Sequence, residues 1–158
     1  MSRRSRDATL MDCAYAFEVR STCIRKVGAV IAIDGRILSS GYNGAPVGLP
    51  HCDHTCSCGG SRVGDTTGAL PHDAMCRMVR PCVLTVHAET NAILFAARHG
   101  TRIEGATLYT TVSPCWPCAL AIVNAGLIRV VYDVEYRDPQ GVNLLREARV
   151  ELRQLTKE

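Results

Sequence analysis

The chain of 158 residues is 47% apolar and 21% charged, an ordinary globular composition that excludes general disorder. No run of about 18 apolar residues occurs, and no apolar segment follows the basic N-terminus, so neither a transmembrane helix nor a secretory signal is predicted. The net charge of +3 is too small for a strong nucleic-acid footprint. We therefore expect a cytoplasmic protein with no membrane or nucleic-acid partner.

The periodicity of the apolar residues predicts helices and strands that alternate along most of the chain. In chain order these are a helix over 7–20, strands over 27–33 and 36–42, a helix over 88–99, a strand over 106–112, a helix over 115–125, a strand over 128–132, a helix over 142–148 and a strand over 149–152. Asp34-Gly35 indicates a hairpin between the first two strands. Strands that alternate with helices favour parallel pairing, so we expect one antiparallel pair, at the hairpin. The prediction is an α/β fold, a three-layer α-β-α sandwich around a mixed five-stranded sheet, in a single domain over 1–158.

The cysteines and the long segment before the second predicted helix are unusual. The chain has nine cysteines, an odd number, and without an export signal these favour metal ligation or catalysis over disulfides. Residues 41–86 show no sustained period, and a cysteine-rich insertion occupies about 51–85. So long a stretch without regular structure is uncommon in a compact domain unless it is functional or held in place.

Two short motifs, each at the start of a predicted helix, point to a metal centre. Cys115 and Cys118 are three residues apart, so they face the same way on one helical turn, where thiolates are favoured. His87 can supply a third ligand, and three protein ligands with an open position are typical of catalytic zinc. Glu89 follows His87 by two residues and is predicted to move protons beside the metal. H-x-E together with P-C-x-x-C is a signature of zinc nucleobase deaminases.

The segments HAETNAILFAARHG at 87–100 and IEGATLYTTVSPCWPC at 103–118 resemble the deoxycytidylate (dCMP) deaminase family, in particular its phage members. The segments VGAV at 27–30 and GYNGAP at 41–46 are similar to the same family's first hairpin and substrate loop. The resemblance implies a cytidine-deaminase-like fold, one catalytic zinc, and conversion of dCMP to dUMP and ammonia, which feeds dTMP synthesis. It also implies a homohexamer, with dCTP and dTTP as effectors.

The predicted roles follow from the residues and from this resemblance. Zinc makes hydroxide available near neutral pH for attack on C4 of the pyrimidine, while Glu89 transfers protons to N3 and to the leaving amine. The resemblance places Asn43 on the sugar or base and Tyr136 near the nucleotide. The charge excess near the N-terminus makes Arg25 or Lys26 the expected phosphate contact. The resemblance also suggests subunit or effector contacts for Phe95 and Arg98, although Phe95 at helical spacing is equally compatible with a core position.

A second, structural zinc is predicted inside the insertion, with Cys52, Cys58 and Cys82 as the proposed ligands. Related deaminases bear cysteines near the positions of Cys52 and Cys82, and a structural zinc contributes on the order of 10 kcal/mol to folding. Buried free thiols are the alternative explanation for these cysteines.

Two other functions compete with dCMP deamination. One is a zinc deaminase that acts on another cytosine nucleotide, a nucleoside, guanine or a nucleic-acid base, although the 5% aromatic content argues against a polynucleotide groove. The other is a non-catalytic zinc module, against which Glu89 argues, because a structural site does not need a carboxyl beside an open position.

Overall fold

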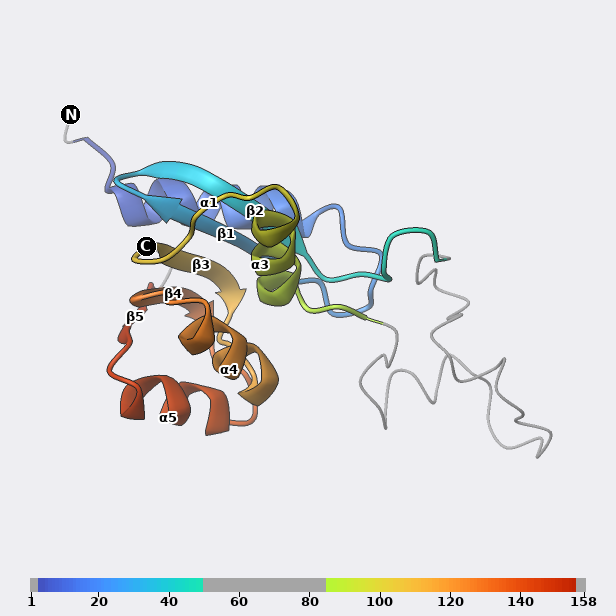
Figure 1. The fold of residues 1–158 in the computed structure, drawn as a ribbon. Helices are drawn as coiled ribbons and strands as arrows, with labels where there is room; N and C mark the ends of the chain where they lie inside the picture. The colour runs from blue at the N-terminus through green and yellow to red at the C-terminus, as the bar shows by residue number, and fades with distance from the viewer. Residues whose placement is uncertain (1–2, 50–84, 156–158) are drawn as a thin grey trace.

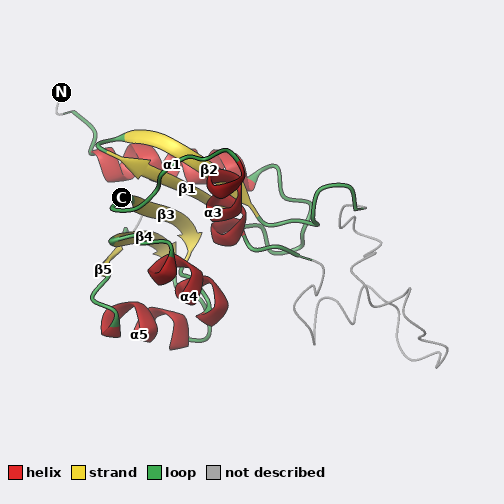
Figure 2. Cartoon of the chain, in the orientation of Figure 1, coloured by secondary structure: helices red, strands yellow, loops and turns green. Residues whose placement is uncertain are grey.

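The computed structural model describes residues 3–49 and 85–155. Its five strands form one mixed sheet in the order β2-β1-β3-β4-β5, with α1 on one face and the other described helices on the opposite face (Figures 1 and 2). The elements are α1 (Arg6–Glu18), β1 (Gly28–Ile33), β2 (Arg36–Tyr42), α3 (Ala88–Arg98), β3 (Thr107–Val112), α4 (Trp116–Asn124), β4 (Arg129–Val134), α5 (Gln140–Glu147) and β5 (Glu151–Gln154). The predicted three-layer sandwich is confirmed. The predicted insertion lies almost entirely outside the described residues.

The turn and helix-end signals are confirmed where the backbone needs positive φ. Asp34 and Gly35 have φ of 51° and 81°, which is the type I′ pattern, and the flanking Ile33 and Arg36 pair in the hairpin. Gly100 and Gly126 follow α3 and α4 with φ of 65° and 73°, where a side chain would be strained.

The expectation of a single antiparallel pair is wrong. β1 pairs antiparallel with both β2 and β3, whereas β3–β4 and β4–β5 are parallel. The connection from β2 through α3 to β3 does join two strands that run in the same direction, as a crossover requires. However, β1 lies between these two strands, so they are not neighbours. The alternation of helices and strands along the sequence indicates the direction of each strand. It does not show the order of the strands in the sheet, and so does not predict that β1 lies between β2 and β3.

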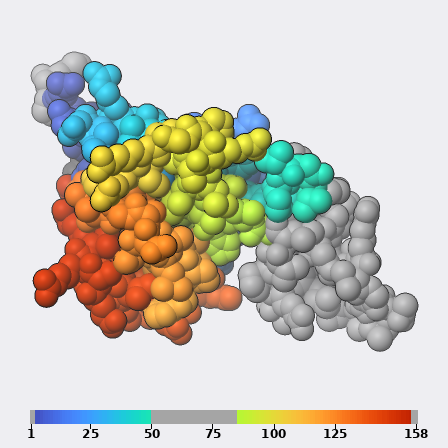
Figure 3. Space-filling model, in the orientation of Figure 1, coloured from blue at the N-terminus to red at the C-terminus, as the bar shows by residue number. Residues whose placement is uncertain are grey.

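Two apolar cores lie on the two faces of the sheet. Alternate residues of β1 point to opposite sides: Ala29 and Ile31 belong to the core that lies on the side of α3, α4 and α5, and Val30 and Ala32 belong to the core on the side of α1. Figure 3 shows the face on which α3, α4 and α5 lie, together with the connection from α3 to β3. No helix among the described residues is long and apolar enough to cross a membrane.

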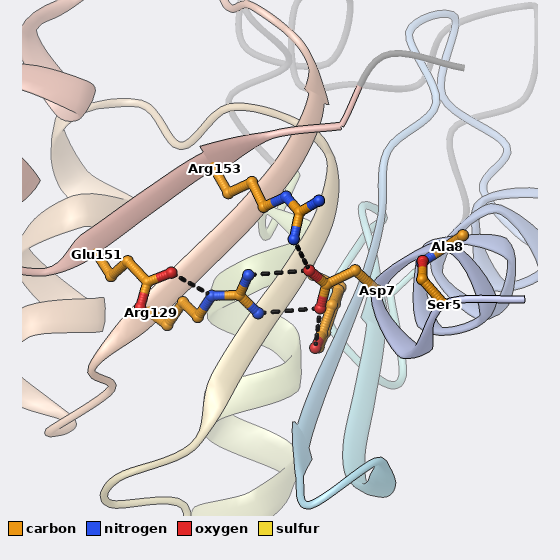
Figure 4. Close-up of polar contacts among 7 residues, drawn as sticks. Ser5, Asp7, Ala8, Arg129, Glu151 and Arg153 are labelled. Atoms are coloured by element: carbon orange, nitrogen blue, oxygen red, sulfur yellow. Dashed lines mark hydrogen bonds and ion pairs between the residues drawn. The ribbon is translucent and has the colours of Figure 1, made fainter. Parts of the chain in front are cut away.

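A carboxyl at the start of α1 connects the two ends of the chain. Asp7 accepts two hydrogen bonds of 2.9 Å from Arg129 on β4 and one of 2.8 Å from Arg153 on β5 (Figure 4). The Tyr109 hydroxyl on β3 donates a further bond of 3.0 Å, and Arg129 also pairs with Glu151. The hydrogen bonds from Arg129 hold the pKa of Asp7 below its usual value. This network, which the sequence did not indicate, fixes α1 against three strands.

Candidate metal and active site

Helix α3, which begins directly after His87, is held tightly against β2. A side chain at Gly41 would place its Cβ 2.3 Å from the carbonyl oxygen of Ala88, so only glycine permits this close approach. The Ser39 hydroxyl donates to the carbonyl of Ala92 at 2.6 Å, and the Asn91 amide donates to the carbonyl of Tyr42 at 2.7 Å. These contacts fix the first turn of α3 on the sheet.

The chain leading into α3 is also tied to the segment after β2. Val86 forms a β-bridge with Gly44, with N–O distances of 2.9 and 3.1 Å. His87 then takes the N-cap position of α3 with extended backbone. This bridge therefore joins the segment that contains Asn43 to the segment that contains the predicted metal ligand His87.

The two cysteines stand at the start of α4, directly after β3. Cys115 is the N-cap residue and Cys118 lies in the first turn, as the sequence predicted. The preceding Ser113 is buried; its amide donates to the carbonyl of Val134 at 2.8 Å, and its hydroxyl accepts a bond of 2.7 Å from the amide of Tyr136. Because β2 and β3 run in the same direction, α3 and α4 both begin at the same edge of the sheet.

His87, Cys115 and Cys118 converge on one point, where their ligand atoms lie within 4.8 Å of one another. The Nδ1 atom of His87 is 3.2 Å from Sγ of Cys115 and 3.4 Å from Sγ of Cys118. Tetrahedral zinc, with bonds of about 2.0 Å to nitrogen and about 2.3 Å to sulfur, places these atoms about 3.6 Å apart. The donor types and their separation thus fit zinc, with one coordination position left open.

The ionisable groups of the cluster lie in hydrogen-bond contact with one another. The hydrogen bond from the Cys118 thiol holds the pKa of Cys115 well below its usual value, while the same contact and burial raise the pKa of Cys118. The hydrogen bond with Cys115 raises the pKa of His87. A divalent cation changes this balance, because it favours the thiolate form of both cysteines.

Glu89 is 4% exposed and has no ion-pair partner among the described residues. Burial raises the pKa of Glu89 to about 7, although a hydrogen bond from its own backbone amide opposes the shift. A carboxyl with that pKa can both accept and release a proton near neutral pH.

The predicted substrate residues are only partly brought to the site. The Asn43 side chain is buried and already bonded to backbone: it accepts from the amide of Val27 at 2.7 Å and donates to the carbonyl of Arg25 at 2.8 Å. Asn43 thus holds the turn that carries Arg25 and Lys26, whose exposed side chains have no hydrogen-bond or ion-pair partner in the described part of the chain. Tyr136 is half-buried and is connected to the site through its backbone bond to Ser113.

Sequence reasoning missed two side chains around the cluster. The Thr90 hydroxyl lies 3.5 Å from Sγ of Cys118, and Ser113 joins the β3–α4 and β4–α5 connections. Thr90 is three residues after His87, the spacing of one helical turn, which was the available signal. Phe95 is 54% exposed and stacks on the His99 ring, so the core alternative for Phe95 is wrong.

One histidine and two cysteines thus meet from the N-terminal ends of two helices, and a buried glutamate lies beside them. Zinc-dependent nucleobase deaminases hold their metal with this set of ligands and use such a glutamate to transfer protons. A sequence profile of the cytidine and deoxycytidylate deaminase zinc-binding region matches residues 4–134. The chain therefore belongs to the cytidine and deoxycytidylate deaminase family, as its motifs predicted.

Individual proteins of this family are similar to the chain in sequence and in structure. The deoxycytidylate deaminase of Enterobacteria phage T2 is 38% identical over 168 aligned residues, which cover 92% of this chain and 89% of the phage protein. That of Mycobacterium phage D29 is 40% identical over 136 residues, with 85% and 99% covered. The crystal structure of dCMP deaminase from cyanophage S-TIM5 with dCMP and dUMP superposes with a TM-score of 0.75 at 28% identity, covering 98% of this chain and 100% of that one.

Proposed function

We propose that this chain catalyses the zinc-dependent hydrolytic deamination of dCMP to dUMP and ammonia. The observation that carries the proposal is the convergence of His87, Cys115 and Cys118 next to a buried carboxyl, Glu89. The relatives named deoxycytidylate deaminase support the choice of substrate.

The proposed roles follow from the geometry. His87, Cys115 and Cys118 hold the zinc ion, which when bound supplies a water that ionises near neutral pH. Glu89 would take one proton from the attacking water and deliver it to N3 of the cytosine as the water oxygen bonds to C4. It would then take the remaining proton of the new C4 hydroxyl and pass it to the amine, so that the C4–N bond breaks, the C4 carbonyl forms and ammonia departs. A pKa of about 7 suits Glu89 to both the acid and the base role.

The proposed substrate contacts depend on how the nearby backbone is held. Arg25 and Lys26 are the proposed phosphate contacts, because they are cationic and exposed and their backbone is fixed by Asn43. Asn43 is proposed to serve substrate binding, at least by holding this turn. Tyr136 is the proposed nucleotide contact after β4.

A substrate comparison tests the proposal. We expect ammonia release from dCMP to exceed that from deoxycytidine by roughly 10²-fold or more in kcat/KM, because charge-assisted contacts to phosphate contribute a few kcal/mol. A short cytosine-containing oligonucleotide is the third substrate. Equal rates on nucleoside and nucleotide would contradict the dCMP assignment, and preference for the oligonucleotide would favour a nucleic-acid deaminase.

The resemblance also predicts a homohexamer, regulation by dCTP and dTTP, and supply of dUMP for dTMP synthesis, and a cytoplasmic location is the further expectation from the sequence. Self-association is supported by exposed apolar side chains on two neighbouring helices, α3 and α4: Leu94, Phe95, Trp116, Leu120 and Val123. Light scattering, and rates with and without dCTP, test the assembly and the regulation. Arg98 is exposed on α3, as an effector or subunit contact requires.

The predicted single domain with an insertion, and the second zinc site, stay predictions. Cys52, Cys58 and Cys82 lie outside the described residues. Metal analysis distinguishes two zinc ions per chain from one, and Cys52→Ser is expected to lower a ratio of two to one.

A further inference from the structure

The start of α5 presses directly on the backbone that carries one of the proposed zinc ligands. Gly141, the second residue of α5, is buried, and a Cβ at this position would lie 2.1 Å from the carbonyl oxygen of Pro114. The same Cβ would lie 2.6 Å from the carbonyl carbon of Cys115 and 2.8 Å from its oxygen. All three are backbone atoms, so no side-chain rotation can relieve the overlap.

Helix α5 cannot easily withdraw from this contact. Asp138 accepts a hydrogen bond of 3.0 Å from the amide of Gln140, which fixes the first turn, and Leu145 anchors the helix with a fully buried side chain. On the other side, Pro114 is fully buried and Ser113 is bonded to the chain after β4. An added methyl group therefore displaces the Pro114–Cys115 backbone by about 1 Å to restore a normal contact distance.

Helix propensity alone gives the opposite expectation. Within a helix, glycine is less favourable than alanine by up to about 1 kcal/mol, so Gly141→Ala should stabilise an isolated α5. Glycine here also has no positive φ that would require it. The close approach to Cys115 is the structural reason that remains for its presence.

We propose that Gly141 is a positioning residue for the metal site: its lack of a side chain lets α5 support the Pro114–Cys115 backbone, which sets where Sγ of Cys115 meets His87 and Cys118. The inference rests on the proposed zinc site. Supports of metal ligands typically change metal affinity 10- to 100-fold when they are altered.

The test is cobalt titration of the full chain after zinc removal, in a Cys52→Ser background that removes the predicted second cysteine site, read by the thiolate-to-cobalt absorption that reports sulfur ligation. For Gly141→Ala we expect about 10- to 100-fold weaker cobalt binding and an altered absorption band, in a protein that keeps its circular dichroism spectrum. Unchanged affinity with an unchanged band in folded Gly141→Ala would overturn the proposal.

Gly28→Ala is the matched steric control. Its Cβ would lie 1.9 Å from the carbonyl oxygen of Ala14, an overlap at least as severe, but against α1 on the opposite face of the sheet. We expect Gly28→Ala to lose stability while the folded fraction keeps the cobalt band. Loss of the band in Gly28→Ala as well would contradict a specific role for Gly141, because general destabilisation would then explain both variants.

If Gly141→Ala yields no folded protein, Asp138→Ala decides the question, because it loosens the start of α5 without adding atoms. Severalfold weaker cobalt binding in folded Asp138→Ala supports the proposal, and unchanged binding overturns it. Wild-type protein without thiolate-to-cobalt absorption would contradict the proposed zinc site itself, and this inference with it.

Discussion

Two buried carboxyls, one on each face of the sheet, have opposite surroundings. Asp7, at 8% exposure, accepts hydrogen bonds from Arg129, Arg153 and Tyr109. Glu89, at 4% exposure, has no ion-pair partner in the described chain. The pKa of Asp7 is lowered by the Arg129 hydrogen bonds, whereas burial raises that of Glu89 to about 7.

This difference indicates that Asp7 stabilises the fold, whereas Glu89 takes part in the reaction. Asp7 stays ionised at neutral pH, so it can hold elements together but cannot exchange protons during a reaction. Glu89 is costly to bury without an ion-pair partner, which the described residues do not supply, and such a group persists where a ligand or a reaction uses it. Substitutions at the two positions should therefore affect different measurements.

Glu89→Gln tests the chemical side of the contrast and has the largest expected effect. The amide fills the same space but cannot move a proton, so we expect kcat to fall by about 10²–10⁴-fold while bound zinc is kept. Steady-state ammonia release and metal analysis measure the two quantities. A variant that retains more than about a tenth of wild-type kcat, in an assay limited by chemistry, would show that Glu89 is not the proton carrier.

Arg25→Ala/Lys26→Ala tests whether two exposed cations, which have no hydrogen-bond or ion-pair partner among the described residues, serve a ligand. We expect KM for dCMP to rise by up to roughly 10²-fold, because the phosphate loses its charge-assisted contacts. Deoxycytidine, which has no phosphate, is the control substrate and should be deaminated as before. An unchanged KM for dCMP would remove both residues from the proposed site.

Asp7→Asn tests the structural side. The neutral amide leaves Arg129 and Arg153 without their carboxylate, so we expect the free energy of unfolding to fall by about 2 kcal/mol. Urea denaturation measures this change, and kcat per folded molecule should stay at the wild-type value. A stable Asp7→Asn protein with impaired kcat would reverse the roles given to the two carboxyls.

Acid should remove the same stabilisation from the wild type. Because the folded-state pKa of Asp7 lies below its unfolded value of about 3.9, its contribution is complete above that value and is lost as pH falls through the folded-state pKa. The difference in urea midpoint between wild type and Asp7→Asn should thus be constant above about pH 5 and shrink below about pH 4. A difference that does not depend on pH would exclude ionised Asp7 as its source.

Asp12→Asn has the smallest expected effect and is the matched control on the same helix. Asp12 pairs with Arg4, but both side chains are more than half exposed, so we expect a loss of less than about 1 kcal/mol. A loss as large as that of Asp7→Asn would mean that burial does not distinguish the two carboxyls.

The sequence predicted the metal-ligating residues better than the tertiary contacts that hold them in place. His87, Cys115 and Cys118 were predictable because their chemistry depends on residue type and local spacing at helix starts. The Asp7 network joins positions up to 146 residues apart, and no local pattern encodes such a contact. The backbone bonds of Asn43 and the close approach of Gly141 also depend on tertiary packing, as does the insertion of β1 between β2 and β3.

The position of the metal cluster in the sheet has a thermodynamic consequence. His87 is the N-cap residue of α3, which is hydrogen-bonded to β2, whereas both cysteines follow β3, and β1 separates these two strands. An ion held by all three residues therefore bridges two parts of the chain that lie together in the folded structure. Its binding free energy adds to that of folding, by RT ln(1 + [Zn²⁺]/Kd), so metal availability and resistance to unfolding are linked quantities in this enzyme.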